Sequence, residues 1–187
     1  MGGIEIYAMT VVFILGCVGL IRGASKELGV TMALVVLLAV FAQFEALVGP
    51  DQLPGKLNTI LSGFGLGSND VTRQRMVAWV FYCAAMLVTT FMAYHGQDTL
   101  AFRWQSPSGL PGMALGWLAG ALNGYLIAGT LWYYMRVLDY PMQRYSWFTA
   151  QFTDTAENMV NFLPQNIASG LVMGALALIL LWWRILR

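Results

Sequence analysis

Five segments of the chain are apolar over nearly the length needed to cross a lipid bilayer. A helix needs about 20 apolar residues to span a hydrocarbon layer of about 30 Å. The composition agrees with this pattern, because 58% of the residues are hydrophobic and only 10% are charged. We therefore expect an all-α membrane protein: a polytopic helical bundle of four to five transmembrane helices, forming a single integral membrane domain over residues 1–187. The expected spans are residues 4–21, 28–48, 76–94, 113–135 and 167–183.

The first two connections differ strongly in length. Six residues, RGASKE at 22–27, separate the first two spans. So short a connection predicts a tight antiparallel hairpin, with Ser25 as the N-cap of the second helix. Residues 49–75 are rich in Gly, Asn, Asp and Ser. They predict a polar loop with one short interfacial helix.

The last connection, residues 136–166, is expected to lie at the membrane interface. Within it, Asp154-Thr-Ala-Glu157 has the form of a capping box at the start of a short amphipathic helix, which Pro164 is expected to end. We expect this helix to return the chain to the membrane; docking of a partner is the alternative. The fifth span then ends in two tryptophans before Arg184, as suits a headgroup boundary.

The Lys and Arg residues do not settle the orientation, because they divide equally between the two sides of a five-span arrangement. Short loops weigh more than long ones, so we expect the 22–27 turn and the C-terminus in the cytoplasm and the N-terminus outside. The first span lacks a basic n-region and a small-x-small cleavage site, which favours an uncleaved anchor over a signal peptide. One side carries Lys56, Arg73, Arg75, Arg136 and Arg144, and the other carries Arg22, Lys26, Arg103, Arg184 and Arg187.

Charge and reactive residues argue against several classes of function. A formal net charge of +1 does not favour nucleic acid as a partner. Cys17 and Cys83 lie in apolar runs at depths too different for a disulfide, and His95 has no second histidine to share a haem or metal. The glycines of GFGLG at 63–67 follow no strand, which argues against a nucleotide loop. We therefore expect no catalytic residues, no metal, no cofactor and no small-molecule substrate, and a protein that is not an enzyme.

Ionisable residues are expected only near the helix ends. Glu5, Glu45, Arg136 and Asp139 all lie where a side chain can reach water or headgroups. A pump or transporter usually holds such residues deep in the bilayer, where each costs several kcal/mol. This pattern disfavours an autonomous pump.

The fourth span carries a repeated series of small residues. Four-residue steps advance only 40° around a helix, so these positions form a slowly rotating groove without side chains. Such a groove allows close approach of another helix, and Asn123 lies on the same side, where it can hydrogen-bond across the contact. The alternative is that glycine is simply common in membrane helices. The expected packing residues are Gly112, Gly116, Gly120, Asn123, Gly124 and Ala128.

Three segments resemble the colicin V production (CvpA) family of bacterial inner-membrane proteins. LGWLAGALNGYLI at 115–127 resembles the family's glycine-spaced helix, and IEIYAMTVVFILGCVGLIRGASKELG at 4–29 resembles its first span. ENMVNFLP at 157–164 resembles its late segment. The residues that carry the resemblance are Glu5, Arg22, Gly23, Glu27 and Pro164.

The resemblance implies a multi-pass inner-membrane protein with a role in toxin production or secretion and in envelope maintenance, without an established chemical activity. The chain departs from the family at Asn123, where members often have arginine, and in the fifth span, which adds to a four-helix core. The expected partners are the bilayer and other membrane helices, from a second copy or a larger complex. The alternatives are an accessory subunit of a respiratory, photosynthetic or secretory complex and, third, a pore-forming subunit.

Overall fold

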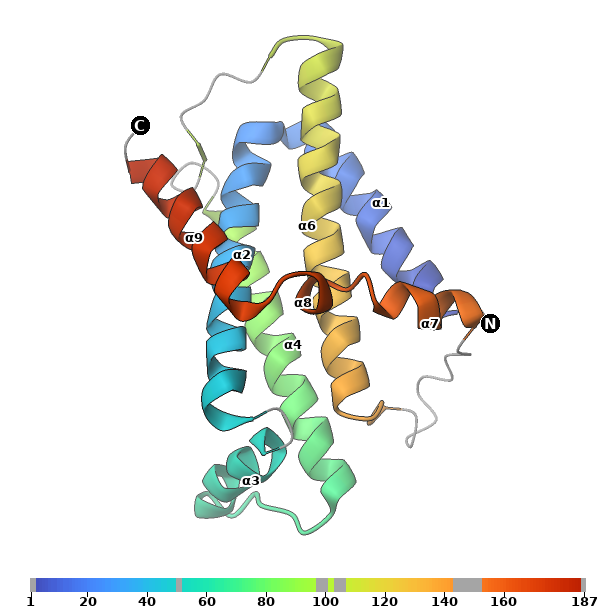
Figure 1. The fold of residues 1–187 in the computed structure, drawn as a ribbon, viewed down its shortest axis with the longest axis vertical. Helices are drawn as coiled ribbons and strands as arrows, with labels where there is room; N and C mark the ends of the chain where they lie inside the picture. Colours follow the sequence, from blue (N-terminus) through green and yellow to red (C-terminus); the bar gives the residue numbers. More distant parts are fainter. Residues whose placement is uncertain (1–2, 50–51, 97–100, 103–106, 143–152, 186–187) are drawn as a thin grey trace.

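The computed structural model describes residues 3–49, 52–96, 101–102, 107–142 and 153–185. All regular structure in these ranges is helical, and the long helices alternate in direction (Figure 1). This arrangement confirms the prediction of an all-α helical bundle. The helices are α1 (Ile4–Arg22), α2 (Ala24–Val48), α3 (Leu53–Gly63), α4 (Val71–His95), α6 (Leu110–Val137), α7 (Asp154–Val160), α8 (Pro164–Ile167) and α9 (Gly170–Ile185).

Four of these helices, α1, α2, α4 and α6, are long and apolar enough to cross a membrane, so the chain is a membrane protein. The fifth predicted span, 167–183, lies almost entirely in α9, which is apolar but only 16 residues long. It packs obliquely on α2, and its C-terminal end lies at the same end of the bundle as the α1–α2 turn (Figure 1).

A single residue, Gly23, makes the turn between α1 and α2. Its φ of +82° is readily adopted only by glycine, and its N–H donates to the carbonyl of Gly19. The predicted six-residue turn was therefore too long, and Ser25 is not the N-cap. Its hydroxyl donates instead to the carbonyl of Phe102. Because the turn is so short, Glu27 lies within the first turn of α2 rather than in a loop.

The N-cap of α7 lies one residue earlier than the capping box predicted. Thr153, not Asp154, is the N-cap of α7, since its hydroxyl accepts from the N–H of Ala156. Pro164 does not end this helix; it opens α8, where a missing N–H costs nothing. The buried residues of the connector pack on the bundle of the same chain. This cluster contains Ile4, Trp132, Ala156, Val160 and Leu163.

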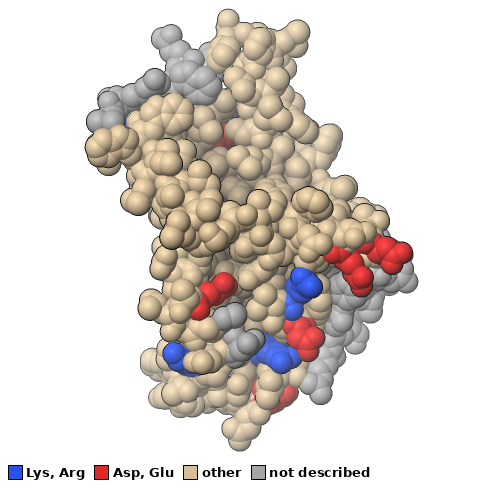
Figure 2. Space-filling view, in the orientation of Figure 1, with Lys and Arg blue, Asp and Glu red and all other residues tan. Residues whose placement is uncertain are grey.

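The core lies where α2 packs against both α4 and α6. Phe41 of α2 meets the rings of Tyr82 and Tyr134 edge-on, and these two tyrosines stack with ring centroids 3.5 Å apart. On the face shown in Figure 2, charged side chains gather in the lower half, over α3, the start of α4, the end of α6 and α7, and the described residues of the upper part show almost none. Such a division is typical of a bundle whose uncharged part lies in the bilayer.

Candidate functional site

The glycines of α6 lie against α1 of the same chain. A Cβ on Gly116 would overlap the carbonyl oxygen of Gly19, and one on Gly120 would overlap the carbonyl oxygen of Leu15. A Cβ on Gly124 would meet the backbone of Val12. The two backbones therefore touch over two turns, which is the approach that small residues permit between membrane helices.

The two ends of the predicted series behave differently. Gly112 faces the carbonyl of Pro107, just before α6, and is not part of the contact with α1. Ala128 lines an apolar groove together with Ala8 and Val11 of α1. The helix that fills the glycine groove is thus a helix of this chain.

Asn123 points to the other side, into a buried polar network centred on Glu27. Both side chains are 0% exposed. Asn123 Nδ2 donates to Glu27 Oε2 at 2.8 Å and to the Glu27 carbonyl at 3.1 Å. The hydroxyl of Thr31 donates to Asn123 Oδ1 at 2.7 Å. The amide therefore links α6 to the first two turns of α2.

The other oxygen of Glu27 carries the ion pair of the network. Arg22 Nη1 lies 3.0 Å from Glu27 Oε1, and the guanidinium sits 4.3 Å from the ring centroid of Tyr94. The Tyr94 hydroxyl donates to Glu27 Oε2 at 3.0 Å. Both carboxylate oxygens are satisfied, and four helices contribute: α1, α2, α4 and α6.

This network corrects the expectation that ionisable residues occur only where they reach water. Glu27, expected in a polar turn, is enclosed by the bundle, and only 12% of the Arg22 side chain is exposed. Arg22 therefore does not act as a free loop charge in the orientation count. A buried, paired carboxylate inside a candidate membrane span is typical of a functional site in membrane proteins.

The remaining residues of the family resemblance lie elsewhere. Glu5 Oε1 accepts from the hydroxyl of Thr153 at 2.7 Å and so ties the start of α1 to α7. Pro164 packs against Gly129 of α6. Gly23 makes the turn beside the network. The structure thus brings Arg22, Gly23, Glu27 and Asn123 together and keeps Glu5 and Pro164 apart from them.

Thr31 and Tyr94 are members that the sequence did not identify. Thr31 follows Glu27 by four residues, one helical turn, and this spacing was the available signal. Tyr94 comes from the far end of α4, and no local pattern links it to Glu27.

The network is suited to holding helices rather than to catalysis. Its carboxylate already accepts from three side chains, so it is not placed to take a proton from a substrate. Within the described residues, no group of three or more His, Cys, Asp or Glu side chains could hold a metal ion. Cys17 and Cys83 are free thiols.

Comparison of the chain with protein-family models, with curated proteins and with solved structures found no match. The functional interpretation therefore depends on the geometry of the site and on the residues that carry the family resemblance.

Proposed function

We propose that the chain is a non-enzymatic, multi-pass protein of the bacterial inner membrane, which supports toxin production or secretion, or envelope maintenance, by assembling with other membrane helices. The observation that carries this proposal is the hydrogen bond between Glu27 and Asn123. These residues come from the two longest segments that resemble the CvpA family, 4–29 and 115–127. Each segment resembles the family on its own, and the two segments also meet in one buried site. This contact supports the resemblance as a property of the fold rather than of two unrelated stretches.

The main departure from the family is chemically understandable at this site. An arginine at position 123 would place a second cation beside Glu27. Asn123 supplies neutral hydrogen bonds instead, and Arg22 remains the cation paired with the carboxylate. The site keeps a hydrogen-bonded carboxylate with either residue.

Assembly with other helices has to use a surface other than the glycine groove, because α1 fills that groove. Large apolar side chains remain exposed along the outer faces of the helices, where lipid or a neighbouring helix can cover them. On α4 these are Val71, Val80, Phe81, Leu87, Val88, Phe91 and Met92.

Complementation tests the proposed role. A bacterial strain that lacks its own colicin V production protein should regain colicin V export when it expresses this chain. Glu27→Leu should abolish the rescue, and Lys56→Leu, at an exposed position of α3 outside the three resembling segments, should preserve it. A wild-type chain that inserts into the membrane but restores no export would contradict the proposal.

Purification of the native assembly separates the accessory-subunit alternative. Membranes solubilised in a mild detergent should yield the chain with itself or with export partners. A fixed stoichiometry with the subunits of a respiratory or photosynthetic complex would support the accessory role instead. Recovery of a lone small homo-oligomer would exclude it.

A conducting role is the second candidate, and the buried Arg22–Glu27 pair favours it, because intramembrane ionisable pairs often mark ion paths. In proteoliposomes, conduction predicts that Asn123→Leu alters ion flux while the protein still assembles. A purely structural role predicts no flux in either protein.

A further inference from the structure

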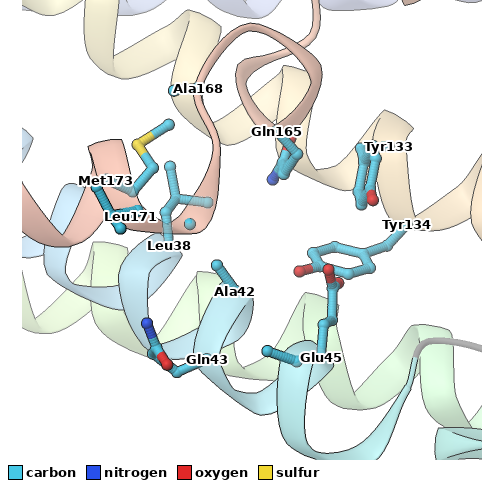
Figure 3. A pocket seen from close by; sticks show the side chains of 12 residues that line it. Leu38, Ala42, Gln43, Glu45, Tyr133, Tyr134, Gln165, Ala168, Leu171 and Met173 are labelled. Carbon is cyan, nitrogen blue, oxygen red and sulfur yellow. The ribbon is translucent and has the colours of Figure 1, made fainter.

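A second polar region lies near the other end of α2. A cavity of about 420 Å³ is bounded there by α2, the C-terminal half of α6 and the segment from α8 into α9 (Figure 3). One side of the cavity is apolar, with Leu38, Leu171 and Met173. Its polar lining residues are Gln43, Glu45, Tyr133, Tyr134 and Gln165.

Three oxygen atoms of this lining are buried without a hydrogen-bond partner among the described residues: Glu45 Oε1, the Tyr134 hydroxyl and Gln165 Oε1. The Tyr134 side chain is nearly enclosed, at 1% exposure. The Gln165 amide nitrogen is already used, since it donates to Thr130 Oγ1 at 2.9 Å. Buried polar atoms are rarely left unpaired. The Tyr134 hydroxyl lies beside Glu45 and can itself donate to that carboxylate, but one hydroxyl serves at most one acceptor. Gln165 Oε1 and the remaining acceptor sites of Glu45 therefore indicate a donor that the described part of the chain does not supply.

The charge of the cavity limits what this donor can be. Glu45 is a carboxylate, and among the described residues no Lys, Arg or His lines the cavity. Figure 3 shows its carboxylate beside the ring of Tyr134. An anion would be repelled, whereas a cation with N–H groups would pair with the carboxylate. The rings of Tyr133 and Tyr134 meet edge to face at the border of the cavity.

A primary ammonium fits this set of groups better than a bare metal ion. It has three N–H donors, enough for Glu45, for Gln165 Oε1 and for a lone pair of the Tyr134 hydroxyl. A volume of about 420 Å³ lies within the usual range for organic ligands. The apolar side of the cavity offers room for a short hydrocarbon body.

We infer that this cavity binds an organic cation in which a primary ammonium group is joined to a short apolar body. The ammonium contacts Glu45, Tyr134 and Gln165, and the body packs on Leu38 and Met173. Both a free alkylamine and the headgroup of a phosphatidylethanolamine present this ammonium chemistry.

Calorimetric titration of the full chain in phosphatidylcholine nanodiscs tests the inference, with butylammonium as the probe. Saturable binding is expected, at least about tenfold tighter than that of butanol or butyltrimethylammonium, because hydrogen bonds to charged groups are strong. Butanol removes the charge, and butyltrimethylammonium removes the N–H donors. Absence of saturable butylammonium binding, or equal binding of butanol, would overturn the inference.

Variants of the lining make the test specific. Glu45→Gln should weaken butylammonium binding about tenfold or more, and Tyr134→Phe, which keeps the ring, should weaken it severalfold. Glu157→Gln makes the same carboxylate-to-amide change on the exposed face of α7 and should leave the affinity unchanged. If Glu45→Gln does not fold, Tyr134→Phe and Gln165→Leu decide the question. Unchanged affinity in the folded variants overturns the inference.

Lipid composition distinguishes the two sources of the ammonium. If a headgroup is the natural occupant, phosphatidylethanolamine in the nanodiscs should weaken butylammonium binding about tenfold by competition, and Glu45→Gln should remove that difference. If a free amine is the occupant, the affinity should be the same in both lipids. Either result supports the shared ammonium chemistry. These measurements do not depend on the proposed role in export, so either conclusion can fail without the other.

Discussion

Glu27 and Glu45 lie on the same face of α2 but in opposite surroundings. Eighteen residues separate them, which is five helical turns or about 27 Å. Glu27 accepts from Arg22, Tyr94 and Asn123, and no oxygen of its carboxylate is unpaired. Glu45 borders a cavity and has an unpaired buried oxygen. The same residue type therefore has two different roles in α2. Glu27 joins helices through paired hydrogen bonds, and Glu45 lines a cavity in which one of its oxygens is unpaired.

The neighbouring residues of α6 explain this difference. Beside Asn123, Gly120 and Gly124 let the backbone of α1 approach closely, so helices enclose the Glu27 network. Near Glu45, α6 instead presents the bulky side chains of Tyr133 and Tyr134, and the cavity lies beside them. Four predictions test whether the first site is structural and the second is not.

The largest effect is expected for Glu27→Leu. It leaves the Arg22 guanidinium buried without its carboxylate, a change that usually costs about 3–5 kcal/mol. The free energy of unfolding can be measured by tryptophan fluorescence in mixed SDS–detergent micelles. The double variant Arg22→Leu/Glu27→Leu should recover much of this loss, because an apolar pair replaces the ion pair. A single variant as stable as the wild type would show that the ion pair does not hold the bundle.

Gly120→Leu should be the next most damaging change. Its side chain would overlap the backbone of Leu15 and Gly19, and backbone cannot move aside like a flexible side chain. We expect a loss of about 3 kcal/mol, at the upper end of the range for overpacking, in the same unfolding assay. The control is Leu122→Ala, which lies on a different face of α6 and is 42% exposed. This change should alter stability little. Equal stability of Gly120→Leu and the wild type would refute the contact between α1 and α6.

Asn123→Leu should have a moderate effect. It removes two donated hydrogen bonds and one accepted bond but leaves the ion pair of Glu27 in place. Hydrogen bonds between membrane helices contribute about 0.6–2 kcal/mol, so we expect a loss in this range. Thr31→Val, which removes one partner of Asn123, should cost less. A loss as large as that of Glu27→Leu would mean that Asn123, rather than the ion pair, organises the site.

The long helices were predictable because their apolar runs match the bilayer thickness, and the small residues at 116, 120 and 124 indicated a close contact. The burial of Glu27 was not predictable from RGASKE, which has the polar composition of an exposed turn. One glycine with positive φ shortens that turn and moves Glu27 into the bundle. The partner of the glycine groove and the cavity at Glu45 depend on contacts between distant segments, and no local pattern encodes such contacts. Pro164 is compatible with both the end and the start of a helix, and tertiary packing decides between them.

The smallest effect on stability is expected for Glu45→Gln. A buried carboxylate with an unpaired oxygen is costly, and a neutral amide at the same place costs less. We therefore expect a free energy of unfolding equal to that of the wild type, or higher by about 1 kcal/mol. The assay is the one in which Glu27→Leu is expected to lose stability. A loss of about 3 kcal/mol would place Glu45 in the same structural class as Glu27 and remove the contrast between them. Because ligand binding and stability are measured separately, a stable Glu45→Gln that no longer binds butylammonium would assign this end of α2 to recognition rather than to folding.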